Sequence, residues 1–170
     1  KGDGSTDDTA AIDAALALGY CKLYAGRTYK VTTITADTTD DWVLDARGAY
    51  IESTLADDSN EPIMFVDTCA NWKIKGGHFS SDNVVDRTTG HGISTKDCTA
   101  FSITGAIVDT VRGVGINNDH AVDYLIFGNT IRNTLADGCQ NYGASTIGRI
   151  TANQIYNSGD DSISLNSYLT

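Results

Sequence analysis

The chain has 170 residues, of which 41% are hydrophobic and 20% charged, which is ordinary for a globular protein with one core. Twelve Lys and Arg against 22 Asp and Glu leave a net charge of −10, which argues against nucleic acid and anionic membranes as partners. An acidic polysaccharide is not excluded, because a local basic patch can override the global sign. The sequence has no apolar run of the ~18 residues that spanning a bilayer requires.

The chain holds 17 Gly but a single Pro. Gly, Asn and Asp must therefore make the turns, which suits many short strands joined by tight corners. The four cysteines are Cys21, Cys69, Cys98 and Cys139. No two of them have the CxxC spacing of a zinc site, and we expect neither a metal site nor a cofactor.

The first segment predicts a helix over residues 8–18. Apolar side chains recur there at helical spacing, at Ala11, Ile12, Ala15 and Leu16. Candidates for its amino-terminal cap are Asp7, Asp8 and Thr9. Gly19 is a natural stop. Such a helix can cover an exposed end of the strand-rich structure that follows.

Two short alternating strands, hinged at Gly26, are expected within residues 22–31. The segments GDGSTDDTAAIDAAL, from Gly2, and LYAGRTYKV, from Leu23, resemble the opening of right-handed parallel β-helix proteins of the pectate-lyase superfamily. This opening is shared by phage tailspike depolymerases, polygalacturonase-like hydrolases and some epimerases. The resemblance implies an all-β fold, a right-handed single-stranded parallel β-helix with an N-terminal capping helix.

The middle of the chain repeats with a period in the twenties, which is typical of a solenoid. The columns at steps of 23 or 24 are Gly92, Gly115, Gly138 and Ser162; Ile103, Ile126 and Ile150; and Ile107, Ile131 and Ile155. We therefore expect one domain over residues 1–170, with rungs over 22–170. We interpret it as the N-terminal part of a longer solenoid.

An aromatic column runs beside the isoleucines, at Trp72, Phe101 and Tyr124. Residues two apart on a strand share a face, so each rung offers an aromatic ring and an Ile to the interior. The larger first step implies an excursion at residues 80–90, whose polar sequence predicts a loop outside the solenoid.

Cys69 and Cys98 occupy matching places in two rungs, since DTC precedes WKI as KDC precedes FSI. Stacked rungs would bring their backbones ~4.8 Å apart, within the range of a disulfide. We favour a stack of small buried thiols.

Three acidic residues lie at corners one repeat apart, at Asp137, Asp160 and Asp161. Cleavage of a glycosidic bond needs one carboxyl to protonate the leaving oxygen and another to activate water or attack carbon. Stacked carboxylates repel each other, which favours the protonated form that a general acid requires. Asp-Gly and Gly-Asp-Asp are also what a tight corner uses for hydrogen bonding, so a purely structural role stays open.

The segments LADG, ending at Gly138, and GDD, from Gly159, resemble the first two motifs of glycoside hydrolase family 28, the polygalacturonases. That family has Asn-Thr-Asp followed by Gly/Gln-Asp-Asp; the first segment here lacks the Asn and Thr. The resemblance implies Asp160 as the general acid, with Asp137 and Asp161 as candidate bases. The family's later motifs, Gly-His-Gly and Arg-Ile-Lys, are expected beyond Thr170.

Guanidinium groups pair bidentately with sugar carboxylates, and tyrosine rings provide stacking platforms. Candidate substrate-binding residues are therefore Arg132, Tyr142, Arg149 and Tyr156.

The sequence predicts a polysaccharide-degrading tailspike or depolymerase that hydrolyses a bacterial surface glycan. The resemblance implies a homotrimer, in a virion tail or secreted. One alternative is a polysaccharide lyase that abstracts the proton beside a uronate carboxylate, with Ca²⁺ held by the same Asp cluster. The other is a β-helix without catalytic activity, which binds a glycan or receptor or serves as a shaft.

Overall fold

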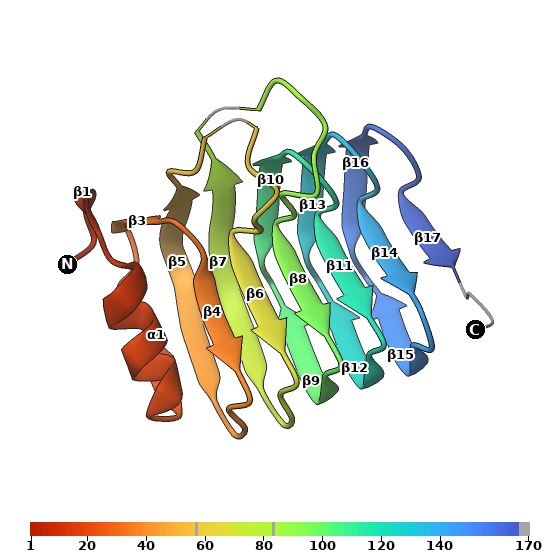
Figure 1. Cartoon of the computed structure of the whole chain (residues 1–170), viewed down its shortest axis with the longest axis horizontal. Coiled ribbons are helices and arrows are strands. Elements are labelled where there is room, and N and C mark those ends of the chain that lie inside the picture. The colour runs from red at the N-terminus through yellow and green to blue at the C-terminus, as the bar shows by residue number, and fades with distance from the viewer. Residues whose placement is uncertain (57, 83, 167–170) are drawn as a thin grey trace.

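The structure is a computed structural model that describes residues 1–166 except 57 and 83; the expected rung residues 167–170 lie outside the described part. The chain folds as a right-handed parallel β-helix, in agreement with the expected all-β solenoid. Figure 1 shows the rungs stacked side by side, with the N-terminal helix at one end.

The described strands form two parallel sheets. Sheet A has eleven strands: β1 (Asp3–Asp7), β2 (Tyr20–Lys22), β3 (Thr28–Val31), β5 (Val43–Ser53), β7 (Lys73–Ser81), β9 (Thr99–Thr104), β10 (Ile107–Val111), β12 (Val122–Phe127), β13 (Thr130–Thr134), β15 (Thr146–Thr151) and β16 (Gln154–Ser158). Sheet B has six: β4 (Ile34–Asp37), β6 (Met64–Asp67), β8 (Ile93–Lys96), β11 (Ile116–Asp119), β14 (Cys139–Tyr142) and β17 (Ile163–Asn166).

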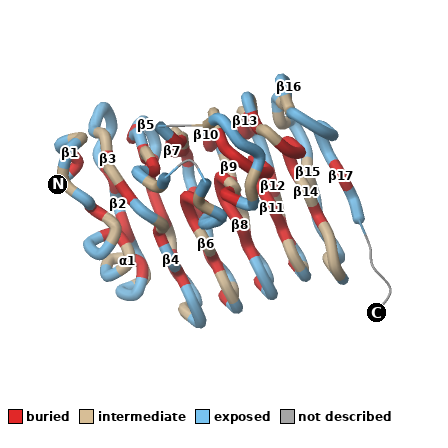
Figure 2. Tube along the Cα trace, turned by 45° about the horizontal axis from the view of Figure 1, so that its top comes forward, coloured by how far each residue is buried: buried red, intermediate tan, exposed pale blue. Residues whose placement is uncertain are grey.

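Each regular rung has three sides. A strand of sheet B is followed by two successive strands of sheet A, as in β8, β9 and β10, and a corner then leads to the next strand of sheet B. In β5 and β7 the two sheet-A segments are continuous through a bend, at which the pairing register of these two strands shifts. Figure 2 shows buried segments along the sides and exposed segments at the turns that follow the sheet-B strands, whereas the corner between β10 and β11, residues 112–115, is buried.

The predicted aromatic column is confirmed, and it begins one rung earlier than expected. Trp42 stacks on Trp72 with ring centroids 4.9 Å apart, and Trp72 stacks on Phe101 at 4.2 Å. Tyr124 continues the stack at 5.5 Å from Phe101. In the next rung Gly148 pairs with Tyr124, and a Cβ there would lie 2.0 Å from the tyrosine ring. The aromatic stack therefore ends at Gly148, because the Tyr124 ring occupies the space that a side chain at this position would need.

The isoleucine column beside the aromatic rings is also confirmed. Ile74, Ile103, Ile126 and Ile150 pair in register across four rungs. A polar ladder lies inside the same solenoid on sheet B. Thr95 donates to Asn118 Oδ1 at 3.0 Å, and Asn118 Nδ2 donates to Asn141 Oδ1 at 2.8 Å. Each buried amide is thus paired with a neighbour from the next rung, which offsets its desolvation.

The glycine column marks a close approach between rungs. A Cβ on Gly115 would lie 2.6 Å from the carbonyl oxygen of Gly138, and one on Gly138 would lie 2.7 Å from that of Ser162. Contacts this short are not tolerated between heavy atoms, so the corner before each sheet-B strand requires glycine in these rungs.

The third predicted column is wrong at its first member. Ile131 pairs with Ile155 as expected, but Ile107 pairs with Thr130, and Val108 pairs with Ile131. The inward position is therefore Val108, which is fully buried, whereas Ile107 is 36% exposed. The step from Val108 to Ile131 is 23 residues, and a register error of one residue moves a side chain to the opposite face.

The predicted capping helix is present as α1 (Thr9–Ala17), with Ile12 and Leu16 buried against the first rungs. Asp8 occupies the N-cap position without a side-chain capping bond. Asp7 Oδ1 instead accepts the amide of Thr9 at 2.9 Å. Asp13 of the helix accepts the amide of Thr35 at 2.9 Å, so α1 also satisfies a backbone donor of the edge strand β4. No described helix has the length and apolar character needed to cross a membrane.

All four cysteines are free and buried, which confirms the thiol interpretation of Cys69 and Cys98. Their thiols point to backbone carbonyls, from Cys69 to Asp67 at 3.2 Å and from Cys98 to Lys96 at 3.3 Å. Burial raises the pKa of Cys98 to about 11, so this thiol stays protonated and unreactive at neutral pH.

The excursion predicted at residues 80–90 is a loop between β7 and β8, except that Ser80 and Ser81 still belong to β7. It packs on the loop of the preceding rung, between β5 and β6. Thr88 Oγ1 donates to the carbonyl of Ser59 at 2.8 Å, and Thr89 Oγ1 donates to Asn60 Oδ1 at 3.1 Å. The two loops arch together over one end of the rungs (Figure 1).

The corrected register predicts opposite outcomes for two adjacent residues. Val108→Asp buries a charge in the core and should lower the free energy of unfolding by about 3–5 kcal/mol or prevent folding. Ile107→Asp, on the outer face, should cost less than about 1 kcal/mol. Denaturant unfolding of the two variants measures the difference. Equal losses, or a larger loss for Ile107→Asp, would show that the register is wrong.

Candidate active site

Asp137, Asp160 and Asp161 come together at one corner of the solenoid, between sheets A and B. Asp137 follows β13, and the other two follow β16 one rung later. Each contributes one carboxylate oxygen to a group whose members all lie within 4.8 Å of one another. The repeat spacing thus places the three carboxyls side by side, as the sequence predicted.

Asp137 is the buried member, with 6% of its surface exposed. Its Oδ1 accepts the backbone amide of Asp161 at 3.2 Å, and its Oδ2 accepts the hydroxyl of Ser164. Both contacts cross to the next rung. The Asp137 side chain therefore fixes the corner that carries the other two carboxyls.

Asp160 and Asp161 are exposed. Arg87, in the loop between β7 and β8, donates from both terminal guanidinium nitrogens to Asp160 Oδ2 at 3.1 Å. The loop thereby reaches a residue 73 positions later in the chain. The carboxylate of Asp160 is therefore held by a side chain of this loop.

A polar hollow of about 260 Å³ lies on the outer face of sheet B. Its lining residues come from three sheet-B strands, β11, β14 and β17, and from the loop before β8: Thr89, His91, Asn117, Gln140, Tyr142 and Asn166. Gln140 pairs in register with Ser164, whose hydroxyl binds Asp137. The hollow and the three carboxyls therefore share one edge of sheet B.

His91 contributes a hydrogen-bond donor to this hollow. Its Nδ1 accepts the backbone amide of Val114 at 2.9 Å, and burial lowers the pKa of His91 to about 4. The ring is therefore neutral above that pH, and its proton is on Nε2. His91 occupies the same corner position as Val114, Asp137 and Asp161 in the following rungs.

Asn117 forms a buried wall of the hollow, with 3% of its surface exposed. Its Nδ2 donates to Ser94 Oγ at 3.2 Å, whereas no described protein group pairs with its Oδ1. A buried acceptor left unpaired costs about 1–3 kcal/mol. A ligand hydroxyl that reaches this oxygen would recover that cost.

The predicted substrate-binding residues lie on three different faces. Tyr142 lines the hollow beside the carboxyls; desolvation and then Asp119 raise the pKa of its hydroxyl. Arg132 and Tyr156 lie on the outer face of sheet A, across the corner, with Arg132 Nη1 donating to the Tyr156 hydroxyl at 3.0 Å. Arg149, on β15, lines a separate hollow with Lys73 and Tyr124. The structure thus places Tyr142 in the hollow on sheet B and Arg149 on another face.

Arg132 also forms an ion pair with Asp109, a residue of the same sheet. Its Nε and Nη2 donate to Asp109 Oδ2 at 2.8 and 2.7 Å. A sugar carboxylate at this position would have to compete with Asp109.

Arg87, Asn117 and His91 are not among the site residues that the sequence predicts. Arg87 reaches the site through a loop that leaves the repeat, so no periodicity reports it. Asn117 could have been found from the repeat. It belongs to a column of outward-facing polar residues that pair in register, Ser94, Asn117, Gln140 and Ser164.

The different burial of two site carboxyls predicts different effects on stability. Asp137→Ala leaves the Asp161 amide and the Ser164 hydroxyl unpaired, and should lower the free energy of unfolding by about 1–3 kcal/mol. Asp160→Ala removes a pair exposed on both sides and should cost less than about 1 kcal/mol. Denaturant unfolding of both variants tests this; an equal or smaller loss for Asp137→Ala would contradict the structural role of Asp137.

The buried imidazole predicts a pH dependence of stability. His91 has a pKa of about 4 in the folded chain and 6.5 as a reference, so between these values the unfolded chain binds the additional proton. The free energy of unfolding therefore holds the full contribution of the neutral His91 ring above pH 6.5. This contribution is lost as the pH falls toward 4, by up to about 3 kcal/mol. His91→Gln, which keeps an acceptor but does not titrate, should reduce this slope in denaturant unfolding at several pH values. The half-exposed His120→Gln is the control, and an unchanged slope in His91→Gln would contradict the prediction.

Solved structures with the same fold include a candidate glycosyl hydrolase from Parabacteroides merdae, at 12% identity and a TM-score of 0.59, covering 99% of this chain and 91% of that protein. ORF18 of Geobacillus virus E2 is 20% identical with a TM-score of 0.66, and the similarity covers 98% of this chain. The chain spans 39% of the length of that viral protein. At these identities the likeness concerns the fold alone.

No curated protein has significant sequence similarity to the chain. A family match covers residues 23–163, which include all the rungs from β3 to the first residue of β17. The chain therefore belongs to the family described as periplasmic copper-binding protein (NosD).

Proposed function

We propose that this chain hydrolyses glycosidic bonds of a bacterial surface polysaccharide at the corner formed by Asp137, Asp160 and Asp161. The observation that carries the proposal is the position of three carboxyls, within 4.8 Å of one another, at the edge of a polar hollow. Two carboxyls in reach of one bond are what acid–base cleavage of a glycoside requires.

The exposed carboxyls are the ones a substrate can reach. In this proposal Asp160 protonates the leaving oxygen and Asp161 activates water, while Asp137 positions both by fixing the corner. Arg87 occupies Asp160 Oδ2, so it has to move away before this oxygen can contact the glycosidic oxygen. The loop that carries Arg87 would thus shift when substrate binds, exchanging the Arg87 contact for a sugar oxygen.

The hollow on sheet B supplies binding groups for sugar hydroxyls. His91 Nε2 donates, and the Tyr142 ring offers an apolar face for a pyranose ring. Asn117 Oδ1 is buried, so it would accept a sugar hydroxyl only after the neighbouring side chains move. Because rungs stack at ~4.8 Å, successive sugar units can lie across successive rungs. Arg132, Tyr156 and Arg149 would contact more distant units of an extended glycan.

A role as a tailspike depolymerase, as a homotrimer in a virion tail or as a secreted protein, is part of this proposal. The fold shared with a viral protein and a candidate glycosyl hydrolase supports it. Depolymerases of surface glycans act outside the host cell, and a solenoid offers the elongated surface that a polymer needs.

A lyase is the second candidate, and the carboxyl cluster favours it. Oxygen ligands from three carboxylates suit Ca²⁺, which could neutralise a uronate before proton abstraction. The third candidate, a non-catalytic glycan-binding shaft, is favoured by the bonds of Asp137 to the next rung, because a corner needs such bonds whether or not it is catalytic.

The copper in the family's description does not fit the groups of this chain. Copper prefers imidazole, thiolate and thioether ligands. Within the part of the chain that the structure describes, the group that could share a metal ion consists of carboxylates alone. The Nδ1 atom of His91 is taken by a backbone amide, and the four thiols are buried.

Asp160→Asn should retain glycan binding, but its rate of hydrolysis should fall at least about 100-fold, because general acid catalysis accelerates such a reaction 10²–10⁴-fold. The full-length protein is incubated with capsule or lipopolysaccharide, and new reducing ends are counted. Asp123→Asn, an exposed acid on sheet A, is the matched control. Undiminished turnover in Asp160→Asn would refute its role.

The same assay separates the alternatives. Unsaturated ends that absorb in the ultraviolet and disappear with chelator would support a lyase. Glycan binding without new ends of either kind would support the shaft.

A further inference from the structure

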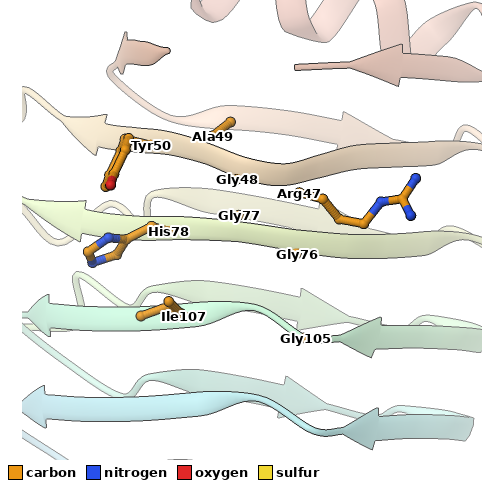
Figure 3. A pocket seen from close by; sticks show the side chains of 9 residues that line it. All are labelled: Arg47, Gly48, Ala49, Tyr50, Gly76, Gly77, His78, Gly105 and Ile107. Carbon is orange, nitrogen blue, oxygen red and sulfur yellow. The ribbon is translucent and has the colours of Figure 1, made fainter. Parts of the chain in front are cut away.

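A trough crosses the outer face of sheet A at the bend between the two strands of each rung. One hollow of about 220 Å³ is lined from β5, β7 and β10, and an adjacent one of about 430 Å³ shares Arg47, Gly76 and Gly105 with it. Figure 3 shows Arg47 on one side of a row of glycines, with Tyr50, His78 and Ile107 on the other side. None of these residues belongs to the carboxyl corner.

The floor of the trough is backbone. The bend glycines have positive φ angles, at Gly48 (75°), Gly76 (67°), Gly105 (64°) and Gly128 (65°). The bend itself explains why these positions are glycine. A Cβ on Gly105 or Gly128 would meet nothing within 4 Å, so the absent side chains leave an open floor that a flat ring can approach.

Aromatic and apolar side chains form one wall. Tyr50 is 45% exposed, and its ring lies 5.5 Å from that of His78 at an angle of 48°. Phe127, 47% exposed, lines the adjacent hollow from the opposite side, because it pairs through Thr104 with Lys75. Exposed aromatic faces beside an open floor suit the apolar face of a sugar ring.

The opposite wall is basic, although the chain as a whole has a net charge of −10. Lys22, Asp45 and Lys75 pair in register on successive rungs. Arg47 donates to both oxygens of Asp45, at 2.8 and 2.7 Å. Asp45 thus pairs with Arg47, and of the basic residues in these columns Arg47 and Lys75 line the trough, which leaves this wall with a net positive charge.

Hydrogen bonds from Arg47 lower the pKa of Asp45 to about 2, so the carboxylate remains charged and holds the guanidinium in place at neutral pH. Arg47 is nevertheless 71% exposed. Its remaining donors are available to a ligand, and Lys75 on the next rung adds an exposed ammonium group.

We propose that this trough is a second saccharide-binding site, specific for an acidic sugar whose carboxylate faces Arg47 and Lys75 and whose ring packs on Tyr50 and His78. Tyr50 and Arg47 are three residues apart on one strand, roughly 10 Å. A ligand that contacts both walls is therefore larger than a simple anion. This site is independent of the proposed hydrolysis, because it lies on another sheet and uses none of the three Asp residues.

The test is a titration of the full chain, isotopically labelled and carrying Asp160→Asn to prevent cleavage, with a galacturonate trisaccharide. Chemical-shift changes should map to residues 47–50, 76–78 and 105–107. The trisaccharide with its carboxylates reduced to alcohols should bind at least about tenfold more weakly, since charged hydrogen bonds supply much of the affinity. Arg47→Gln combined with Lys75→Gln should produce a similar loss, and Tyr50→Ala should weaken both ligands.

Lys96→Gln, a basic residue of sheet B, is the matched control and should leave the affinity unchanged. An equal loss in this control would mean general electrostatic attraction and would overturn the proposal. Shift changes confined to the carboxyl corner, equal affinity for the reduced trisaccharide, or self-association through the trough would also overturn it. Failure of hydrolysis would leave the trough titration unaffected, so the two proposals are tested separately.

Discussion

The whole structure depends on the in-register hydrogen bonding of parallel rungs. Each paired strand residue lies above a partner 22 to 30 positions away, so like side chains stack into columns. Trp42, Trp72, Phe101 and Tyr124 form one such column. Burial of these rings supplies much of the favourable free energy, and the polar Asn118 and Asn141 are accommodated because register pairs their amides. A shift of one residue would place both columns on the wrong face.

The same constraint builds the candidate active site. Rungs that stack directly bring Asp137 beside Asp161 and place His91 two rungs away in the same corner column. The carboxyl that holds the corner is buried, and the two that can meet a substrate are exposed. The loop with Arg87 departs from the repeat, and it lies against Asp160. A rigid scaffold with one irregular loop is a common arrangement for binding and catalysis.

The three sides of the solenoid carry different chemistry. The corner beside sheet B is acidic and its hollow is polar and uncharged, whereas the bend in sheet A is basic with an aromatic wall. The net charge of −10 is therefore an average over faces of opposite sign. Because a solenoid exposes each column along its whole length, one chain can present two extended surfaces to different parts of a polymer.

The sequence by itself determined the β-helix, the capping helix, the aromatic and isoleucine columns and the meeting of Asp137 with Asp160 and Asp161, because a repeat period translates directly into stacking. It failed at Ile107. A step of 24 residues leads from Ile107 to Ile131 and a step of 23 leads from Val108 to Ile131, and only the observed pairing shows that Val108 is the side chain that points inward. It could not reveal the contact between Arg87 and Asp160 or the wall made by Asn117. Nor could it show that Arg132 and Arg149 face different sides. Those features depend on the path of a loop and on the directions of bends, and these are decided by tertiary packing and not by the repeat.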